Sequence, residues 1–213
     1  MLIRERAAAT VAQAPFIRQL GLADYEPAYE AMRRFTAGRN AGTPDEIWTL
    51  QHPPVYTVGL AGRPEHFPRS GDIPVAHIDR GGQITYHGPG QAIAYLLLDL
   101  ARRDLKVRQL VQLAEQAVID LLADFDVAAT RVVGAPGVYV DGAKVAALGL
   151  RVRKGCCYHG ISLNVDMDLA PFSAIDPCGF PGLRVTQTRD LGICAGPAEM
   201  GERLASKVIQ HLQ

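Results

Sequence analysis

A cysteine and a lysine in this chain have surroundings that suit covalent chemistry. Cys178 lies between Pro177 and Gly179, which predicts an irregular backbone that presents the thiol, although a free cysteine is more often a small buried hydrophobe. Lys144 begins an otherwise apolar run that extends to Leu150. A cysteine attacks as the thiolate, which a neighbouring cation favours, so Lys144 is a candidate partner. The lysine could equally extend its ammonium to the surface. Both interpretations remain open for each residue.

The segment Arg80–Gln91 contains four glycines and one proline among polar side chains. Such a segment is either a hairpin with a Gly-Pro-Gly turn or a loop whose backbone N–H groups approach a ligand closely. The flanking runs Ile73–Ile78 and Ala92–Leu100 are typical of buried strands. A glycine-rich connection between two core strands favours the binding loop.

The apolar spacing elsewhere predicts an α/β (α+β) fold, in which one domain over residues 1–213 has a mixed sheet flanked by helices. The clearest helix covers Val107–Phe125, with Arg108, Gln112, Glu115 and Asp120 on its outward face. Asp141–Gly142 is the dipeptide of a tight, primed hairpin turn. The other helices are expected from Asp24 to about Gly38 and over Ala198–Leu212, and the other strands at 16–22, 46–50, 55–59, 131–133, 137–140, 144–152 and 158–165.

Composition excludes several classes of protein. The chain has 213 residues with 22 basic and 22 acidic side chains, so no overall basic surface for nucleic acid is indicated. It has no apolar run long enough to span a membrane and no secretory signal at its start, so we expect a cytoplasmic protein with reduced cysteines. Adjacent Cys156 and Cys157 cannot readily share one tetrahedral zinc, and no C-x-x-C pair completes a site. No metal or other cofactor is therefore expected.

Taken in order, these pieces resemble the lipoyl(octanoyl) transferase family, the octanoyl-[acyl-carrier-protein]–protein N-octanoyltransferases. At Cys156–Cys157 the chain departs from the family's commoner aromatic and hydroxyl residues, a difference expected to bear on the wall of the acyl pocket. The matching segments are Arg80–Gln91, Gly137–Val140, Lys144–Gly149, His159–Gly160, Leu163–Val165 and Pro177–Gly179.

The resemblance implies the fold of the lipoate and biotin protein ligase catalytic domains. It implies transfer of an octanoyl or lipoyl group from acyl carrier protein to a lysine of lipoyl domains, in 2-oxoacid dehydrogenase complexes and the glycine cleavage H protein. Cys178 would form the acyl thioester, and Lys144 would lower the pKa of its thiol. The implied substrate contacts are Arg80, Gly81, Gly82, Gln83, Ile84, Thr85, Tyr86, His87, Ala147, Leu148, Gly149, Gly160, Ile161 and Ser162.

Two other functions compete with this one. An ATP-dependent lipoate or biotin ligase would share the fold but needs no cysteine nucleophile. A non-catalytic module that binds a carrier protein would not need Lys144 and Cys178 together. The sequence does not indicate the oligomeric state, the exact acyl chain length or the surface that receives acyl carrier protein.

Overall fold

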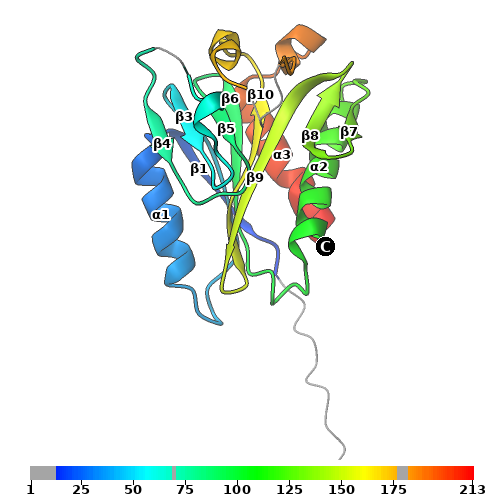
Figure 1. Cartoon of the computed structure of the whole chain (residues 1–213). Helices are drawn as coiled ribbons and strands as arrows, with labels where there is room; N and C mark the ends of the chain where they lie inside the picture. The colour runs from blue at the N-terminus through cyan, green and yellow to red at the C-terminus, as the bar shows by residue number, and fades with distance from the viewer. Residues whose placement is uncertain (1–12, 69–70, 177–181) are drawn as a thin grey trace, which may run out of the picture.

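The computed structural model describes residues 13–68, 71–176 and 182–213, which form two β-sheets with α-helices packed on the larger sheet (Figure 1). The helices are α1 (Tyr25–Ala37), α2 (Val107–Ala123) and α3 (Pro197–Leu212), with 3-10 turns η1 (Pro64–His66), η2 (Ala170–Ala174) and η4 (Thr188–Leu191). The strands are β1 (Phe16–Leu22), β2 (Glu46–Gln51), β3 (Val55–Val58), β4 (Val75–His77), β5 (Ile84–His87), β6 (Gln91–Leu97), β7 (Thr130–Val132), β8 (Ala135–Val140), β9 (Ala143–Arg153) and β10 (Cys156–Asn164).

The larger sheet has seven strands in the order β1-β2-β6-β10-β9-β8-β7. Only β1 and β2 are parallel, and the other neighbours are antiparallel, so the predicted mixed sheet is confirmed. The central strands β6 and β10 are buried along their whole length. This burial explains why both strands are largely apolar rather than alternating with charged residues.

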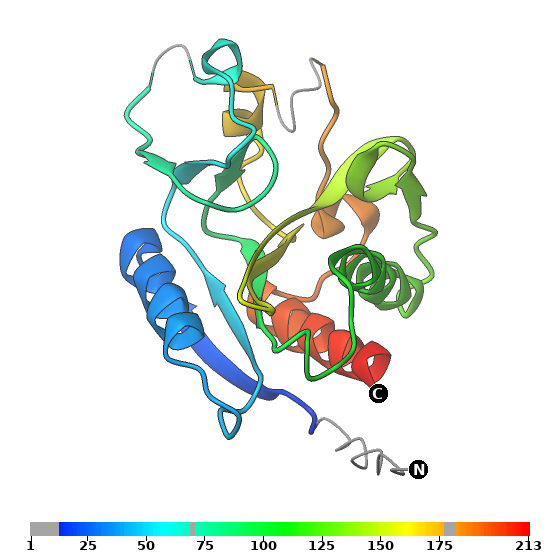
Figure 2. The same ribbon diagram turned by 60° about the horizontal axis from the view of Figure 1, so that its bottom comes forward.

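Helix α1 covers one face of the larger sheet, and α2 and α3 cover the other (Figure 2). Helix α2 begins at the predicted residue and ends two residues early. Its apolar stripe packs against the sheet as predicted, with Leu110, Ala114, Val118 and Leu121 fully buried. Glu115 was expected on the solvent face and is instead buried, because β8 packs beside α2 and Arg131 of β7 pairs with the carboxylate. No helix in the described ranges is long and apolar enough to cross a bilayer.

A second sheet, of three strands in the order β4-β3-β5, was not predicted as a separate unit. Pro53 and Pro54 separate β2 from β3, and proline cannot donate to a continuous ladder. The prediction that a strand over Ile73–Ile78 is buried is wrong for the strand itself, although Ile78 just after it is buried. Strand β4 covers only three residues and lies at a sheet edge, where Val75 is largely exposed.

The glycine-rich block Arg80–Gln91 is neither a hairpin nor a simple loop. It contains β5, which pairs with β3 of the small sheet, and it ends at β6 of the large sheet. The block therefore carries the chain from one sheet to the other. By contrast, the turn at Asp141–Gly142 is as predicted: both residues have positive φ, 47° and 74°, and they join β8 directly to β9.

Candidate active site

A cavity of about 260 Å³ lies between the two sheets. Its walls come from β5, β6, β9 and β10, and Tyr25 of α1 adds an aromatic ring. The lining is mainly apolar, which suits a hydrocarbon chain better than a nucleotide. The lining residues are Tyr25, Arg80, Gly82, Gln83, Ile84, Thr85, His87, Ile93, Tyr95, Gly134, Pro136, Ala147, Leu148, Gly149, His159, Gly160, Ile161 and Ser162.

The fourteen predicted substrate contacts converge on this cavity, except for Gly81 and Tyr86. The Gly81 N–H instead donates to the carbonyl of Leu150 at 2.9 Å. The Tyr86 ring packs edge-on against Phe172, with ring centroids 5.5 Å apart. The contacts of the remaining twelve with a substrate stay a prediction.

Gly149 and Gly160 allow neighbouring groups of the cavity wall to pack closely. A side chain at Gly160 would place its Cβ 2.0 Å from the carbonyl oxygen of Ala94, and one at Gly149 would place it 2.7 Å from Cδ of Arg80. The Arg80 side chain therefore lies over Gly149. Its guanidinium donates to the carbonyl and hydroxyl oxygens of Thr57 at 2.7 and 2.9 Å. These contacts make Arg80 part of the wall of the cavity.

His87 belongs to a chain of neutral hydrogen bonds beside the cavity. Its Nδ1 lies 2.7 Å from Gln91 Oε1, which can only accept, so Nδ1 carries the proton. The Gln91 amide donates to Asn164 Oδ1 at 2.9 Å, and the Asn164 amide donates to the carbonyl of Thr186 at 3.0 Å. Burial lowers the pKa of His87 to about 3, so the ring is neutral at pH 7.

His159 lines the cavity, although the sequence analysis named only its neighbour Gly160 as a contact. Its backbone has φ of +61°, which is rare for a residue with a side chain. Its Nε2 lies 3.7 Å from Oδ1 of Asp79, and this interaction, with hydrogen bonds from the hydroxyls of Tyr158 and Tyr29, holds the pKa of Asp79 well below its usual range. Sequence reasoning also missed Tyr25, Ile93, Tyr95, Gly134 and Pro136 as lining residues, because no local motif marks them.

Lys144 is buried, with 3% of its surface exposed, so the alternative of a lysine that extends to the surface is wrong. Its Nζ donates to the carbonyl of Pro136 at 3.0 Å and lies 5.2 Å from the centre of the Tyr139 ring. The side chain borders a small hollow that shares Thr85 and Ala147 with the main cavity. The structure thus places an amine beside one end of an apolar cavity.

The predicted nucleophile Cys178 lies outside the described residues. Val185, seven residues later, forms a parallel bridge with Lys144. Cys156 and Cys157 lie at the start of β10 and do not line the cavity, so their departure from the family pattern does not alter its wall. Burial raises the pKa of the Cys157 thiol to about 12.

The fold of this chain matches solved structures of lipoate and biotin protein ligases. A lipoate-protein ligase A bound with ATP matches with a TM-score of 0.77 and 16% identity, over 94% of this chain and 86% of that one. A biotin protein ligase from Aquifex aeolicus matches with a TM-score of 0.60 and 16% identity, over 92% and 70%. At this identity the likeness shows the fold, as the sequence predicted.

Within that class, the chain belongs to the lipoyl protein ligase A/B catalytic domain family, whose model matches residues 24–208. An octanoyltransferase from Aromatoleum aromaticum is 65% identical over 188 residues, covering 88% of this chain and 81% of the relative. One from Dechloromonas aromatica is 60% identical over 198 residues, covering 93% and 97%. These relatives confirm the resemblance seen in the sequence and are consistent with octanoyl transfer in protein lipoylation.

Proposed function

We propose that this chain is an acyltransferase that moves an octanoyl or lipoyl group from acyl carrier protein to a lysine of lipoyl domains, through a thioester on Cys178. The acceptors would be lipoyl domains of 2-oxoacid dehydrogenase complexes and the glycine cleavage H protein. The observation that carries the proposal is the buried Lys144 amine beside an apolar cavity. Octanoyltransferases at 60% identity or more support the same activity.

In the first step, the Cys178 thiolate attacks the carbonyl carbon of the acyl-carrier thioester. The bond from that carbon to the carrier sulfur breaks, and the carrier thiolate takes a proton from the Lys144 ammonium. Before the attack, the ammonium favours the thiolate by its charge. One thioester replaces another, so the step is nearly isoenergetic and needs no ATP.

In the second step, the amine of the acceptor lysine attacks the acyl-Cys178 carbonyl. Lys144, now neutral, accepts the proton that the amine loses, and Cys178 leaves as the thiolate. The product is an amide, which is more stable than a thioester, so this step drives the reaction. The same lysine thus serves as acid and then as base.

The fold also suggests which backbone groups hold the oxyanion. Strand β10 lies between β6 and β9, so the N–H groups of Ile161 and Ser162 belong to the ladders of a central strand. Strand β9 pairs with β8 only as far as Ala146, which leaves an outward-facing N–H at Leu148 or Gly149. One such donor typically contributes about 3–4 kcal/mol to an acyl-transfer transition state.

The cavity would hold the hydrocarbon tail of the acyl group. At roughly 0.8 kcal/mol per buried methylene, the seven carbons beyond an octanoyl carbonyl contribute about 5.6 kcal/mol to binding. One methylene more or less changes little, so we expect neighbouring chain lengths to be discriminated weakly.

Intact-mass spectrometry after incubation with octanoyl-acyl carrier protein tests the nucleophile. We expect an octanoyl adduct on the wild-type chain and none on Cys178→Ala. Cys194→Ala is the matched control, because Cys194 is an exposed free cysteine, and it should retain the adduct. Adding a lipoyl domain without ATP should then discharge the adduct. An adduct that persists on Cys178→Ala would refute the proposal, and a strict need for ATP would favour the ligase alternative.

A further inference from the structure

Glu115 of α2 is a buried carboxylate with 6% of its surface exposed. It does not line the cavity and takes no part in the reaction proposed above. A buried carboxylate needs hydrogen bonds or a cation to offset the cost of leaving water. The hydrogen-bond partners of Glu115 indicate the role of its carboxylate.

Both carboxylate oxygens of Glu115 are engaged. Oε2 pairs with the guanidinium of Arg131 at 3.1 Å, and Arg131 also donates to Gln112 O and Gln116 Oε1. Oε1 accepts a hydrogen bond from the backbone N–H of Gly137 at 2.9 Å. The first contact joins α2 to β7, and the second joins it to β8.

The Gly137 N–H and the Pro136 carbonyl belong to the same peptide group. That carbonyl accepts the hydrogen bond from Lys144 Nζ at 3.0 Å. One planar peptide therefore has the Glu115 carboxylate on its N–H side and the Lys144 ammonium on its C=O side. Because hydrogen bonds in series polarise one another, an anion on the N–H strengthens the carbonyl as an acceptor for the cation.

The backbone at Gly137 leaves no room for a side chain between this peptide and Lys144. Its φ is +134°, and a Cβ there would lie 3.0 Å from Cε and 3.3 Å from Nζ of Lys144. The lysine side chain thus lies directly against Gly137. Any rotation of the Pro136–Gly137 peptide would move the acceptor of the ammonium.

We propose that Glu115 is a positioning residue for Lys144, acting through the Pro136–Gly137 peptide. The consequence for catalysis rests on the proposed function, in which Lys144 favours the Cys178 thiolate. Among the described residues, other ionisable groups on the segments around Lys144 are Tyr139 on β8, Asp141 in the β8–β9 turn, Arg131 on β7 and Arg184, whose carbonyl accepts from the Lys144 N–H.

The test is the pH profile of iodoacetamide alkylation at Cys178, measured in the full chain with Cys194→Ala as background. We expect Lys144→Ala to raise the apparent pKa of the thiol. Glu115→Ala should raise it by about one unit, because the ammonium loses its fixed position. Glu115→Gln keeps an oxygen for the Gly137 N–H without the charge, folds more readily, and should give a smaller shift in the same direction.

Arg131→Gln is the matched control, since it removes the ion pair and leaves the Gly137 contact. It should lower the melting temperature without moving the profile. A profile unmoved by Glu115→Ala and Glu115→Gln, but shifted by Lys144→Ala, overturns the positioning role alone. An equal shift in Arg131→Gln also overturns it, because the ion pair would then be the cause. A profile that Lys144→Ala leaves unmoved overturns the lysine's proposed role and this inference together.

Discussion

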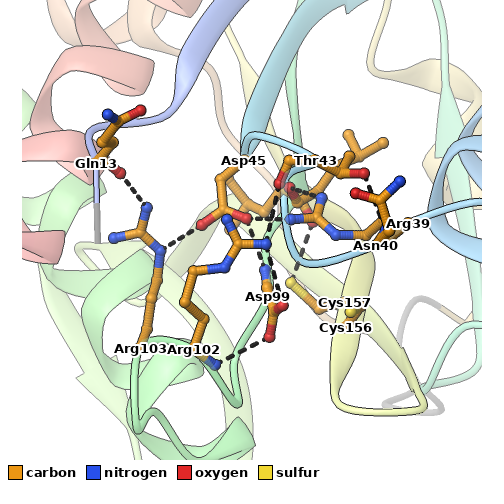
Figure 3. A network of polar contacts seen from close by, with 12 residues as sticks. Gln13, Arg39, Asn40, Thr43, Asp45, Asp99, Arg102, Arg103, Cys156 and Cys157 are labelled. Carbon is orange, nitrogen blue, oxygen red and sulfur yellow. Dashed lines mark hydrogen bonds and ion pairs between the residues drawn. The ribbon is translucent and has the colours of Figure 1, made fainter. Parts of the chain in front are cut away.

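The two ends of the strands in the seven-stranded sheet differ in how their buried polar groups are stabilised. At the end where β9 turns into β10, the lower end in Figure 1, the Asp45 carboxylate pairs with Arg39 and Arg103, and all three side chains are buried (Figure 3). The backbone N–H of Asp99 donates to the same carboxylate at 2.8 Å, and Asp99 pairs with Arg102 at 3.2 Å. This end is held together by charges of opposite sign.

The cavity end buries two histidine rings in their neutral form. Burial lowers the pKa of His52 to about 4 and that of His87 to about 3, so both rings are uncharged at pH 7. His52 lies between the Ala23 carbonyl and the Tyr95 hydroxyl, and His87 contacts Gln91. These contacts satisfy the rings without any ion pair.

Buried charges at one end of the sheet stabilise the fold, whereas those at the other end would take part in the reaction. Paired charges at the lower end fix β2 against the β6–α2 connection, because breaking a pair leaves an ion buried alone. At the cavity end the buried histidines stay neutral, so the charge change of the proposed reaction falls to Lys144 and Cys178. Each prediction below breaks one side of this comparison.

The largest effect should come from Asp45→Ala. It leaves the buried Arg39 and Arg103 guanidinium groups without their shared carboxylate, and such a loss typically costs about 3–5 kcal/mol of unfolding free energy. Urea unfolding followed by circular dichroism measures it. A loss below about 1 kcal/mol would mean that the two guanidinium groups reach water or other acceptors once the carboxylate is removed, and the structural role of the buried pairs would fail.

Acidification should destabilise the cavity end next. The folded pKa of His52 lies below the unfolded value of about 6.5, so the unfolded chain binds the extra proton first and stability falls as the pH drops from 6.5 towards 4. The full contribution of this one ring is on the order of 3 kcal/mol.

The unfolding free energies of wild type and His52→Gln, each measured at pH 7 and pH 4.5, isolate the contribution of His52. The carboxylates titrate in both proteins, so their contribution cancels in the comparison. The wild type should lose about 2 kcal/mol more than the variant over that interval. Equal losses would show that His52 has the same pKa in the folded and the unfolded chain, and the contrast between the two ends would fail.

The smallest effect should come from Arg18→Ala on the edge strand β1. Arg18 pairs with Glu46 at 2.8 Å; the Arg18 side chain is 59% exposed, whereas Glu46 is buried and keeps a hydrogen bond from Trp48. Because the cation is exposed, the pair is screened as salt rises and should contribute about 0.2–1 kcal/mol. Urea unfolding in low and high salt measures the loss of unfolding free energy. A loss equal to that of Asp45→Ala would contradict the view that burial of both partners makes a pair important for stability.

Much of the fold was predictable from local signals. The period of the apolar residues located α2, the Asp141–Gly142 dipeptide located a primed turn, and the apolar run after Gly90 located β6. The boundary between the two sheets was not predictable, because strand pairing depends on residues far apart in the chain. For the same reason, β4 was expected to be buried and lies at an edge.

By itself, the sequence determined the family, the candidate nucleophile and twelve of the residues that line the cavity, because motifs in a fixed order record chemistry directly. Only the tertiary structure decided which charged side chains are buried. Glu115 sits at a position whose helical period predicts solvent, yet β7 and β8 bury it against the peptide that holds Lys144. Burial of a charge depends on what packs over it from elsewhere in the chain, and no local pattern encodes that.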